Sequence, residues 1–348
     1  MAKRLGKFTI SLTNKPKIIS AYSVVGKKEG EGHFKNYFDH ILKDDRFGEK
    51  SYEGSEKRLL EFAITNAIDK SKKSFNEIDL LIAGDLMNQI TSSSFSARAL
   101  NLPFLGLYSA CSTMSEGLAV GACLTDGKCV NTCAVATASH FATVEKQFRF
   151  PLELGNQRPP VAQWTVTGAG CSVLSNLPCE NYLAKIERVT FGKVVDFGIK
   201  DVNNMGAAMA PSAQFSIISH FEDTKTTPED YDLILTGDLG KLGSEILRDL
   251  MEHAGYKLGA NYADCGQMIY TNTQRSFMGG SGAGCSASVF NSYILKKLAT
   301  KELKNVLFVA TGALLSPTSS QQGNSVPGIA HAVYLTAGQA DFENNGVN

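Results

Sequence analysis

The sequence predicts a mixed α/β fold that is built twice, and three observations favour this prediction. The chain has 348 residues, which is long enough for two domains of ordinary size. Segments with helical periodicity alternate with short apolar strands in both halves of the chain. Short motifs of the first half also return in the same order in the second half, which is typical of an internal repeat.

The repeat is clearest where two apolar segments end in Gly-Asp-Leu. The segments 78–86 (IDLLIAGDL) and 231–239 (YDLILTGDL) align Asp85 with Asp238, and Cys111 aligns with Cys285 further along the chain. The other matches are Asp79 with Asp232, Val135-Ala-Thr137 with Val309-Ala-Thr311, and Val166-Thr-Gly168 with Val326-Pro-Gly328. Apolar strands that end in Gly or Thr can look alike by chance, but several matches in one order favour a duplicated half.

Each predicted element has a local signal. Leu59, Phe62 and Ala63 share one face at helical spacing, and Ser55 is a candidate N-cap for that helix. In the first half we expect helices over 55–73 and 112–125, and strands over 78–84, 129–137 and 163–175. In the second half we expect helices over 241–254 and 282–298, and strands over 231–236, 305–311 and 328–336. A boundary near 178–187 then gives an N-terminal half over 1–180 and a C-terminal half over 187–348.

Composition excludes several classes of protein. Lys and Arg together number 34, as do Asp and Glu, so no basic surplus is available to bind nucleic acid. The basic N-terminus has no apolar stretch behind it, so we expect no signal peptide, and no segment has the apolar length of a transmembrane helix. The eight cysteines form no Cys-x-x-Cys pair, which argues against a zinc site and a disulfide scaffold and favours a reducing compartment.

Several longer motifs resemble known families. Cys111 in YSACSTM stands where thiolase-like proteins carry a nucleophile at a helix N-terminus. The segments 103–114 (PFLGLYSACSTM), 158–170 (RPPVAQWTVTGAG) and 192–201 (GKVVDFGIKD) are similar to the stage V sporulation protein AD family of endospore formers. The resemblance covers about 6–340. It implies a thiolase-like αβαβα fold of five layers with two pseudo-equivalent halves.

The same resemblance implies a function. Members of that family are implicated in binding dipicolinic acid, which is pyridine-2,6-dicarboxylate, and in its uptake into the developing spore with membrane-embedded partners encoded in the same operon. We therefore expect a role in sporulation, transport and germination, in the forespore, with peripheral association to the spore inner membrane. A homodimer follows by analogy with thiolase-like proteins. No cofactor or protein-bound metal is expected, and calcium would enter only with the ligand.

The alternative function is an acyl-transferring or condensing enzyme that uses Cys111. A helix N-terminus favours the thiolate, although a free cysteine is more often a small buried hydrophobe. Condensing enzymes of the ketosynthase type also place a His after the strand equivalent to 231–236 and an Asn before the helix equivalent to 282–298. Here the segments 236–240 (TGDLG) and 277–281 (FMGGS) contain neither residue. Since the thiol then lacks a base and an oxyanion partner, we expect a binding protein without catalytic residues.

The first group of candidate ligand-binding residues follows strands of the N-terminal half. Asp85 ends a strand, with the amides of Asn88 and Gln89 beside it, and the alternative for Asp85 is a helix N-cap or a surface turn. Ser112 accompanies Cys111 at the helix N-terminus. A carboxylate such as Asp85 repels a dicarboxylate unless calcium bridges them or one acid is protonated, and the sequence leaves this choice open.

The second group supplies donors from other loops. His140 follows the strand that ends near residue 138, and His331 lies in PGIAH, so either could donate to a carboxylate or be structural. Arg149 could clamp a carboxylate through two hydrogen bonds or pair with a nearby Glu instead. Gly280 and Ser281 could present backbone N–H groups, or form only a tight turn.

Overall fold

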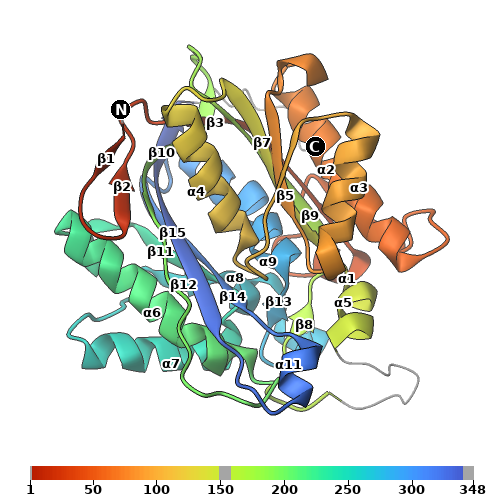
Figure 1. The fold of residues 1–348 in the computed structure, drawn as a ribbon, viewed down its shortest axis with the longest axis vertical. Coiled ribbons are helices and arrows are strands. Elements are labelled where there is room, and N and C mark those ends of the chain that lie inside the picture. Colours follow the sequence, from red (N-terminus) through yellow and green to blue (C-terminus); the bar gives the residue numbers. More distant parts are fainter. Residues whose placement is uncertain (1, 149–157, 340–348) are drawn as a thin grey trace.

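The computed structural model describes residues 2–148 and 158–339, and it contains two half-sheets with helices on both sides (Figure 1). The longer helices are α2 (Tyr52–Lys70), α3 (Thr91–Leu100), α4 (Thr113–Asp126), α5 (Phe141–Phe148), α6 (Met205–Thr224) and α7 (Gly240–His253). The shorter ones are α1 (Lys27–Gly30), α8 (Cys265–Ile269), α9 (Ala283–Val289), α10 (Leu295–Ala299) and α11 (Pro317–Gln321), with a π-helical turn, Phe290–Ile294, between α9 and α10.

The strands of the N-terminal part are β1 (Lys3–Arg4), β2 (Thr9–Ser11), β3 (Lys17–Val25), β4 (His40–Ile41), β5 (Leu80–Gly84), β6 (Phe104–Gly106), β7 (Thr132–Ser139), β8 (Trp164–Thr165) and β9 (Gly168–Ser175). Those that follow are β10 (Tyr182–Thr190), β11 (Leu233–Gly237), β12 (Tyr262–Asp264), β13 (Gly280–Ser281), β14 (Asn305–Ala313) and β15 (Gly328–Gln339). Most elements predicted from the sequence agree with these bounds to within a few residues. The predicted strand 163–175 is wrong as one element, since it forms β8 and β9 in different sheets, and the predicted helix 282–298 contains the π-helical turn.

The strand order repeats. One half-sheet runs β6-β5-β7-β9-β3 and the other runs β12-β11-β14-β15-β10. In each, the first three strands are parallel, and the fourth and fifth are antiparallel to their neighbours. The two half-sheets meet where β3 pairs with β10, over Lys17 and Ile18 only. The α/β fold with two equivalent halves is therefore confirmed in its topology.

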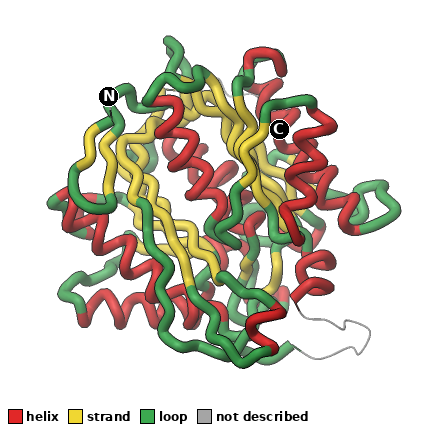
Figure 2. Tube along the Cα trace, in the orientation of Figure 1, coloured by secondary structure: helices red, strands yellow, loops and turns green. Residues whose placement is uncertain are grey.

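The helices complete five layers. α4 lies between the half-sheets, since it contacts β7 on one side and β14 and β15 on the other, and α9 packs beside it. α2 and α3 cover the outer face of the first half-sheet, and α6 and α7 cover that of the second (Figures 1 and 2). No helix was predicted over α6. Twelve of its twenty residues are buried, so its run of Ala and Ser around Pro211 has no polar face that would indicate a helix. Proline is also unfavourable inside a helix.

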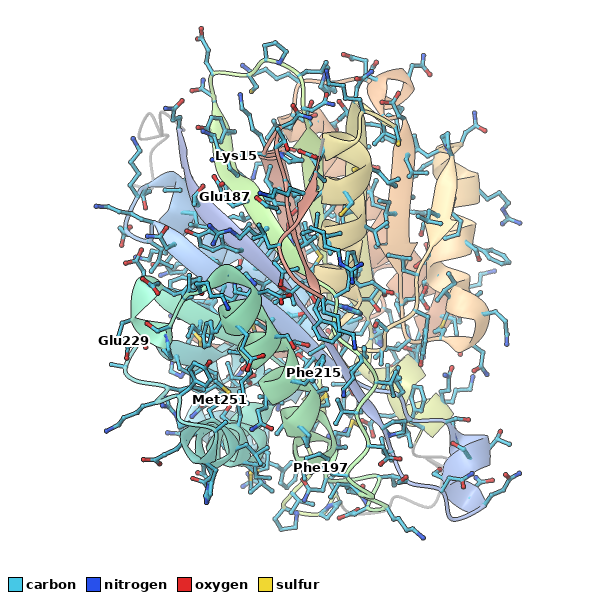
Figure 3. All side chains as sticks on the ribbon, turned by 60° about the vertical axis from the view of Figure 1, so that its left-hand side comes forward. Lys15, Glu187, Phe197, Phe215, Glu229 and Met251 are labelled. Carbon is cyan, nitrogen blue, oxygen red and sulfur yellow. The ribbon has the colours of Figure 1, made fainter. Side chains whose placement is uncertain are left out.

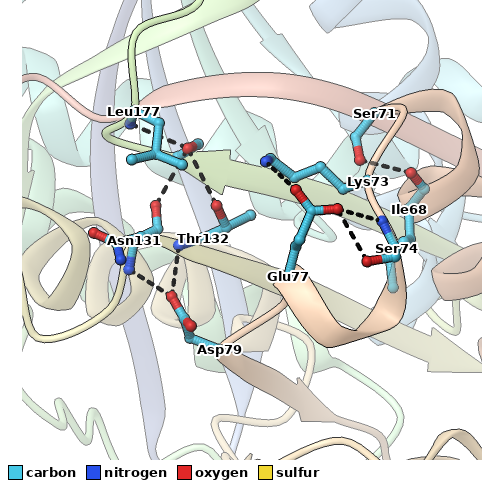
Figure 4. A network of polar contacts seen from close by, with 10 residues as sticks. Ile68, Ser71, Lys73, Ser74, Glu77, Asp79, Asn131, Thr132 and Leu177 are labelled. Atoms are coloured by element: carbon cyan, nitrogen blue, oxygen red, sulfur yellow. Dashed lines mark hydrogen bonds and ion pairs between the residues drawn. The ribbon is translucent and has the colours of Figure 1, made fainter.

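Two aspartates at equivalent positions of the two halves accept the same backbone hydrogen bonds. The Asp79 carboxylate accepts hydrogen bonds from the N–H groups of Asn131 and Thr132 at the start of β7, at 2.7 and 3.1 Å (Figure 4). Asp232 does this for Lys304 and Asn305 at the start of β14, at 2.7 and 2.8 Å. The alignment of these two aspartates in the sequence thus corresponds to one structural role.

Three further features concern the chain as a whole. Lys15, just before β3, forms an ion pair with Glu187 on β10 at 2.9 Å, so a surface contact joins the halves (Figure 3). β10 begins at Tyr182 and therefore includes the residues left between the two predicted halves. Among the residues that the structure describes, no helix combines the length and the apolar character needed to cross a membrane.

Candidate functional site

Cys111 lies at the turn that leads from β6 into α4, between the half-sheets. The turn is tight, since Ala110 adopts a left-handed conformation with φ of 49°. Gly84 and Gly312 pack against it, and a Cβ at either would overlap a carbonyl oxygen, of Leu107 or Ser109 respectively. Only glycine fits at these two positions, so both half-sheets contribute to placing the cysteine.

The group that faces the thiol is a carboxyl from the second half. Asp238 follows β11, is fully buried and has a φ of 71°. Its Oδ2 accepts a hydrogen bond from the N–H of Gly282 at 3.0 Å. The carboxyl lies beside the thiols of Cys111 and Cys285, and its Oδ1 accepts no hydrogen bond of good geometry from the described residues. The carboxyl therefore stands beside the thiol without a cation.

Burial sets the protonation of this pair. Burial, and then the neighbouring carboxylate of Asp264, hold the pKa of Asp238 well above its ordinary value. Burial, and then the charge on Asp238, raise the pKa of the Cys111 thiol well above 9. The helix N-terminus was expected to favour a thiolate, but desolvation and the nearby carboxyl outweigh it here. The raised pKa values favour the protonated form of both groups, and a protonated thiol is a poor nucleophile.

The thiol borders a small cavity of about 30 Å³, which has room for about one water molecule. We call it the inner cavity. Cys111 and Ser281 are the predicted site residues that line it. The other lining residues are Leu86, Tyr108, Ala110, Val144, Phe148, Thr165, Met205, Gly282, Ala313 and Leu315. These described residues include no histidine and no cation, so the inner cavity is apolar with a few weak hydrogen-bonding groups.

A second hollow, of about 310 Å³, lies on the surface next to it. We call it the outer groove. The exposed residues Asn88 and Gln89 line it, together with Met87, Ile90, Gly106, Leu107, Tyr108 and Gln147. Gln147 on α5 holds one wall, since it accepts a hydrogen bond from the N–H of Asn88 and donates one to the carbonyl of Leu86, at 3.0 and 2.9 Å.

Asp85 lies beneath the wall of the outer groove and caps α3. Its Oδ1 accepts from the N–H of Met87 at 2.9 Å, and its Oδ2 accepts from the N–H and hydroxyl of Ser93 at 2.8 and 2.7 Å. The residue is fully buried, and burial raises the pKa of its carboxyl. The structure thus shows the helix-capping alternative, with both oxygens engaged by the protein. Glu56 on α2 is the carboxyl next to it, and it accepts a hydrogen bond from the hydroxyl of Thr143.

The remaining predicted residues do not line either hollow. His140 donates from Nε2 to the carbonyl of Asp45 at 2.8 Å and accepts at Nδ1 from the N–H of Ala142, so its ring is engaged by the backbone. The Ser112 hydroxyl donates to the carbonyl of Ala310 on β14 at 2.9 Å. Gly280 pairs with β8 through its backbone.

His331 lies near the turn, although it does not reach the thiol. Its Nε2 is 3.3 Å from the hydroxyl of Ser109, two residues before Cys111, and its Nδ1 accepts from the N–H of Gly192. Burial lowers the pKa of this imidazole to about 4, so it is neutral at physiological pH. Arg149 lies outside the described residues.

Two residues of the site were missed in the sequence. Asp238 was recognised only as the repeat partner of Asp85, although it follows the strand after which condensing enzymes place a His. That coincidence was the available signal. Tyr108 borders both hollows, and nothing in its local sequence distinguishes it from a core aromatic.

Comparisons with known proteins agree with this architecture. Among solved structures, human mitochondrial 3-ketoacyl-CoA thiolase in complex with CoA superimposes with a TM-score of 0.60 at 12% identity, over 94% of this chain and 99% of that one. The 3-oxoacyl-acyl-carrier-protein synthase III of Aquifex aeolicus superimposes with a TM-score of 0.55 at 11% identity, over 92% and 99%. At these identities the likeness shows the thiolase-like fold alone.

Sequence similarity is far more specific. The family model for stage V sporulation protein AD matches residues 6–336. The stage V sporulation protein AD of Bacillus subtilis (strain 168) is 45% identical over 331 residues, which are 95% of this chain and 97% of that protein. Identity of this extent over nearly full length places the two proteins in one family. The chain therefore belongs to the stage V sporulation protein AD family.

Proposed function

We propose that this sporulation protein binds dipicolinic acid without transforming it, and that it supports uptake of this ligand into the developing spore. Its partners would be membrane-embedded proteins of the same operon, and it would act at the forespore inner membrane. The observation that carries the non-catalytic part is that the buried carboxyl of Asp238, and no imidazole among the described residues of the cavity lining, lies beside the Cys111 thiol. An acyl-transfer nucleophile needs a base at this place, and a carboxyl whose pKa is raised so that its protonated form is favoured is poorly suited to withdraw the proton.

The electrostatics of the site favour a ligand that arrives without net charge. The described residues around the inner cavity provide no cation, and the buried carboxyls of Asp238 and Asp85 lie near Cys111 and Tyr108 of its lining. A dianionic dicarboxylate would be desolvated there without compensation. The calcium chelate or a protonated acid avoids this cost, and calcium would then enter with the ligand rather than bind to the protein. Within the described chain, no cluster of His, Cys, Asp and Glu side chains could hold a metal ion.

A condensing or acyl-transferring enzyme is the second candidate. It is favoured by the placement of Cys111 at the start of α4 and by the enzymes that share the fold. Incubation with acyl-CoA and mass spectrometry of the intact protein distinguishes the two. Binding without chemistry predicts no acyl adduct on Cys111. An adduct that is absent from Cys111→Ala would support the enzyme.

Calorimetric titration with dipicolinate, with and without Ca²⁺, tests the binding proposal directly. We expect Cys111→Ala to weaken binding about tenfold, because a hydrogen-bonding group at the inner cavity is removed. Asp85→Asn keeps the volume of the side chain but replaces one of its two accepting oxygens by a donor, so it tests the carboxyl together with the α3 cap. Cys129→Ala, at an exposed cysteine beyond α4, is the matched control and should bind like the parent. Absence of heat from the parent with either form of the ligand would contradict the proposal. Sedimentation velocity tests the homodimer that we propose by analogy.

A further inference from the structure

The residues expected to bind one ligand lie in two hollows. Cys111 and Ser281 line the inner cavity, whereas Asn88 and Gln89 line the outer groove. Ligand pockets usually have volumes of about 300–1,000 Å³, so the outer groove of about 310 Å³ is large enough and the inner cavity of about 30 Å³ is not. A planar aromatic acid therefore cannot contact Cys111 unless the two spaces join.

Tyr108 is the side chain that the two hollows share. It is 46% exposed, which is unusual for a large aromatic residue three positions before a buried cysteine. Since it lines both hollows, its side chain borders Cys111 and the rest of the inner cavity as well as the outer groove. Burial, followed by the charges of Cys111 and Asp85, raises the pKa of its phenol to about 12.

The wall of the outer groove opposite Tyr108 is strained. Gln89 and Ile90 are successive residues with φ of 56° and 46°, and this left-handed conformation is rare for a β-branched side chain. Ile90 reaches over Gly106, where a Cβ would overlap its Cδ1 atom. Strain of this kind persists where the surrounding structure enforces it, and it is concentrated at ligand-binding sites. The hydrogen bonds of Gln147 to the loop supply that enforcement.

We infer that Tyr108 is the partition between the outer groove and the inner cavity, and that it sets the specificity of the site for flat aromatic acids. Rotation of its side chain joins the two spaces, and its ring then offers a stacking face to the ligand while the acid groups reach the amides of Asn88 and Gln89 on one side and Cys111 on the other. The identity of the ligand rests on the proposed function. The partition itself does not, because it concerns access to the thiol.

The access arm of the test measures alkylation of Cys111 by iodoacetamide at pH 8.5, with peptide mapping to separate the eight cysteines. The parent should react slowly. Tyr108→Ala should react at least tenfold faster, Tyr108→Leu should be intermediate, and Tyr108→Phe should stay within twofold of the parent. Phe95→Ala, which removes an aromatic residue of similar exposure on α3, is the control and should have no effect. Rates for Tyr108→Ala and Tyr108→Leu that equal the parent rate would overturn the partition.

The ligand arm repeats the alkylation with dipicolinate and Ca²⁺ present. Ligand should protect Cys111 in the parent, and Tyr108→Ala should need at least tenfold more ligand for the same protection, since the stacking face is lost. Equal protection of both proteins would overturn the specificity role. If the parent binds no dipicolinate while Tyr108→Ala still exposes the thiol, the proposed function fails and the partition stands. Emission from Trp164, the one tryptophan of the chain, verifies that each variant is folded.

Discussion

Replacement of Glu56 by Gln should change how the stability of the protein depends on pH. Glu56 is fully buried on α2, and burial, followed by the charge on Asp85, raises the pKa of its carboxyl from 4.5 to about 8. The folded state then holds a proton that the unfolded state releases above pH 4.5. Because the folded state binds more protons, the free energy of unfolding falls as pH rises between about 4.5 and 8.

The size of the effect follows from one proton. Its slope is at most about 1.4 kcal/mol per pH unit, so the contribution of Glu56 changes by no more than about 4 kcal/mol between pH 5 and pH 8. A glutamine does not titrate and avoids burying a charge. We therefore expect Glu56→Gln to gain stability relative to the parent as pH rises from 5 to 8.

Urea unfolding followed by Trp164 fluorescence at several pH values measures this difference. Glu53→Gln is the matched control on the same helix, three residues away. Glu53 is more exposed, and its hydrogen bond with Lys146 lowers the pKa of its carboxyl, so its removal should not reproduce the trend. Parallel curves for the parent and Glu56→Gln over the whole range would refute the assignment of the buried proton to this carboxyl.

Three other perturbations give expected outcomes. Asp238→Asn removes a carboxyl that opposes the thiolate once it ionises, so the pH profile of Cys111 alkylation should move to lower pH; a profile that stays in place would show that burial acts alone. Gly312→Ala should displace the turn of Cys111 and weaken dipicolinate binding at least tenfold, whereas Gly259→Ala, which has space for a Cβ, should bind normally in the same titration. Asp79→Asn and Asp232→Asn should lower the free energy of unfolding by similar amounts, about 1 kcal/mol each, and clearly unequal losses in urea would argue against equivalent roles.

The fold could be predicted from the sequence because the same arrangement of strands and helices occurs in both halves of the chain. Each half needs a buried parallel strand that ends in Gly, and a carboxylate such as Asp79 that receives the start of the next strand. Because both halves have these requirements, the same residue types occur at equivalent positions of the two halves. The helix α6 was not predicted because it is buried on most sides, and a helix without a polar face lacks the hydrophobic periodicity on which the prediction depends.

The site was accessible only in part. Cys111 was identified because a helix N-terminus is a local feature, whereas the approach of Asp238 to its thiol depends on how the two halves stack. His140 illustrates the opposite error of local reading. It follows a strand, as a ligand-binding residue would, but its ring nitrogens are engaged by the carbonyl of Asp45, far away in the sequence, and by the N–H of Ala142, two residues later. The hydrogen bond to Asp45 depends on the tertiary structure and cannot be anticipated from residue type.

The pair Asp85 and Asp238 shows how a duplicated fold acquires an asymmetric site. Both residues follow the strand at the same position of their half-sheets, and both are buried. Asp85 turns to the N-terminus of its own α3, but in the second half Asp264 accepts the N–H groups of Leu239 and Gly240 at the start of α7. Because Asp264 performs the capping role there, Asp238 is free of it and can face Cys111 across the interface of the halves. Burial and this carboxyl together raise the pKa of the Cys111 thiol, and an acyl-transfer nucleophile would need a group at this place that acts as a base instead.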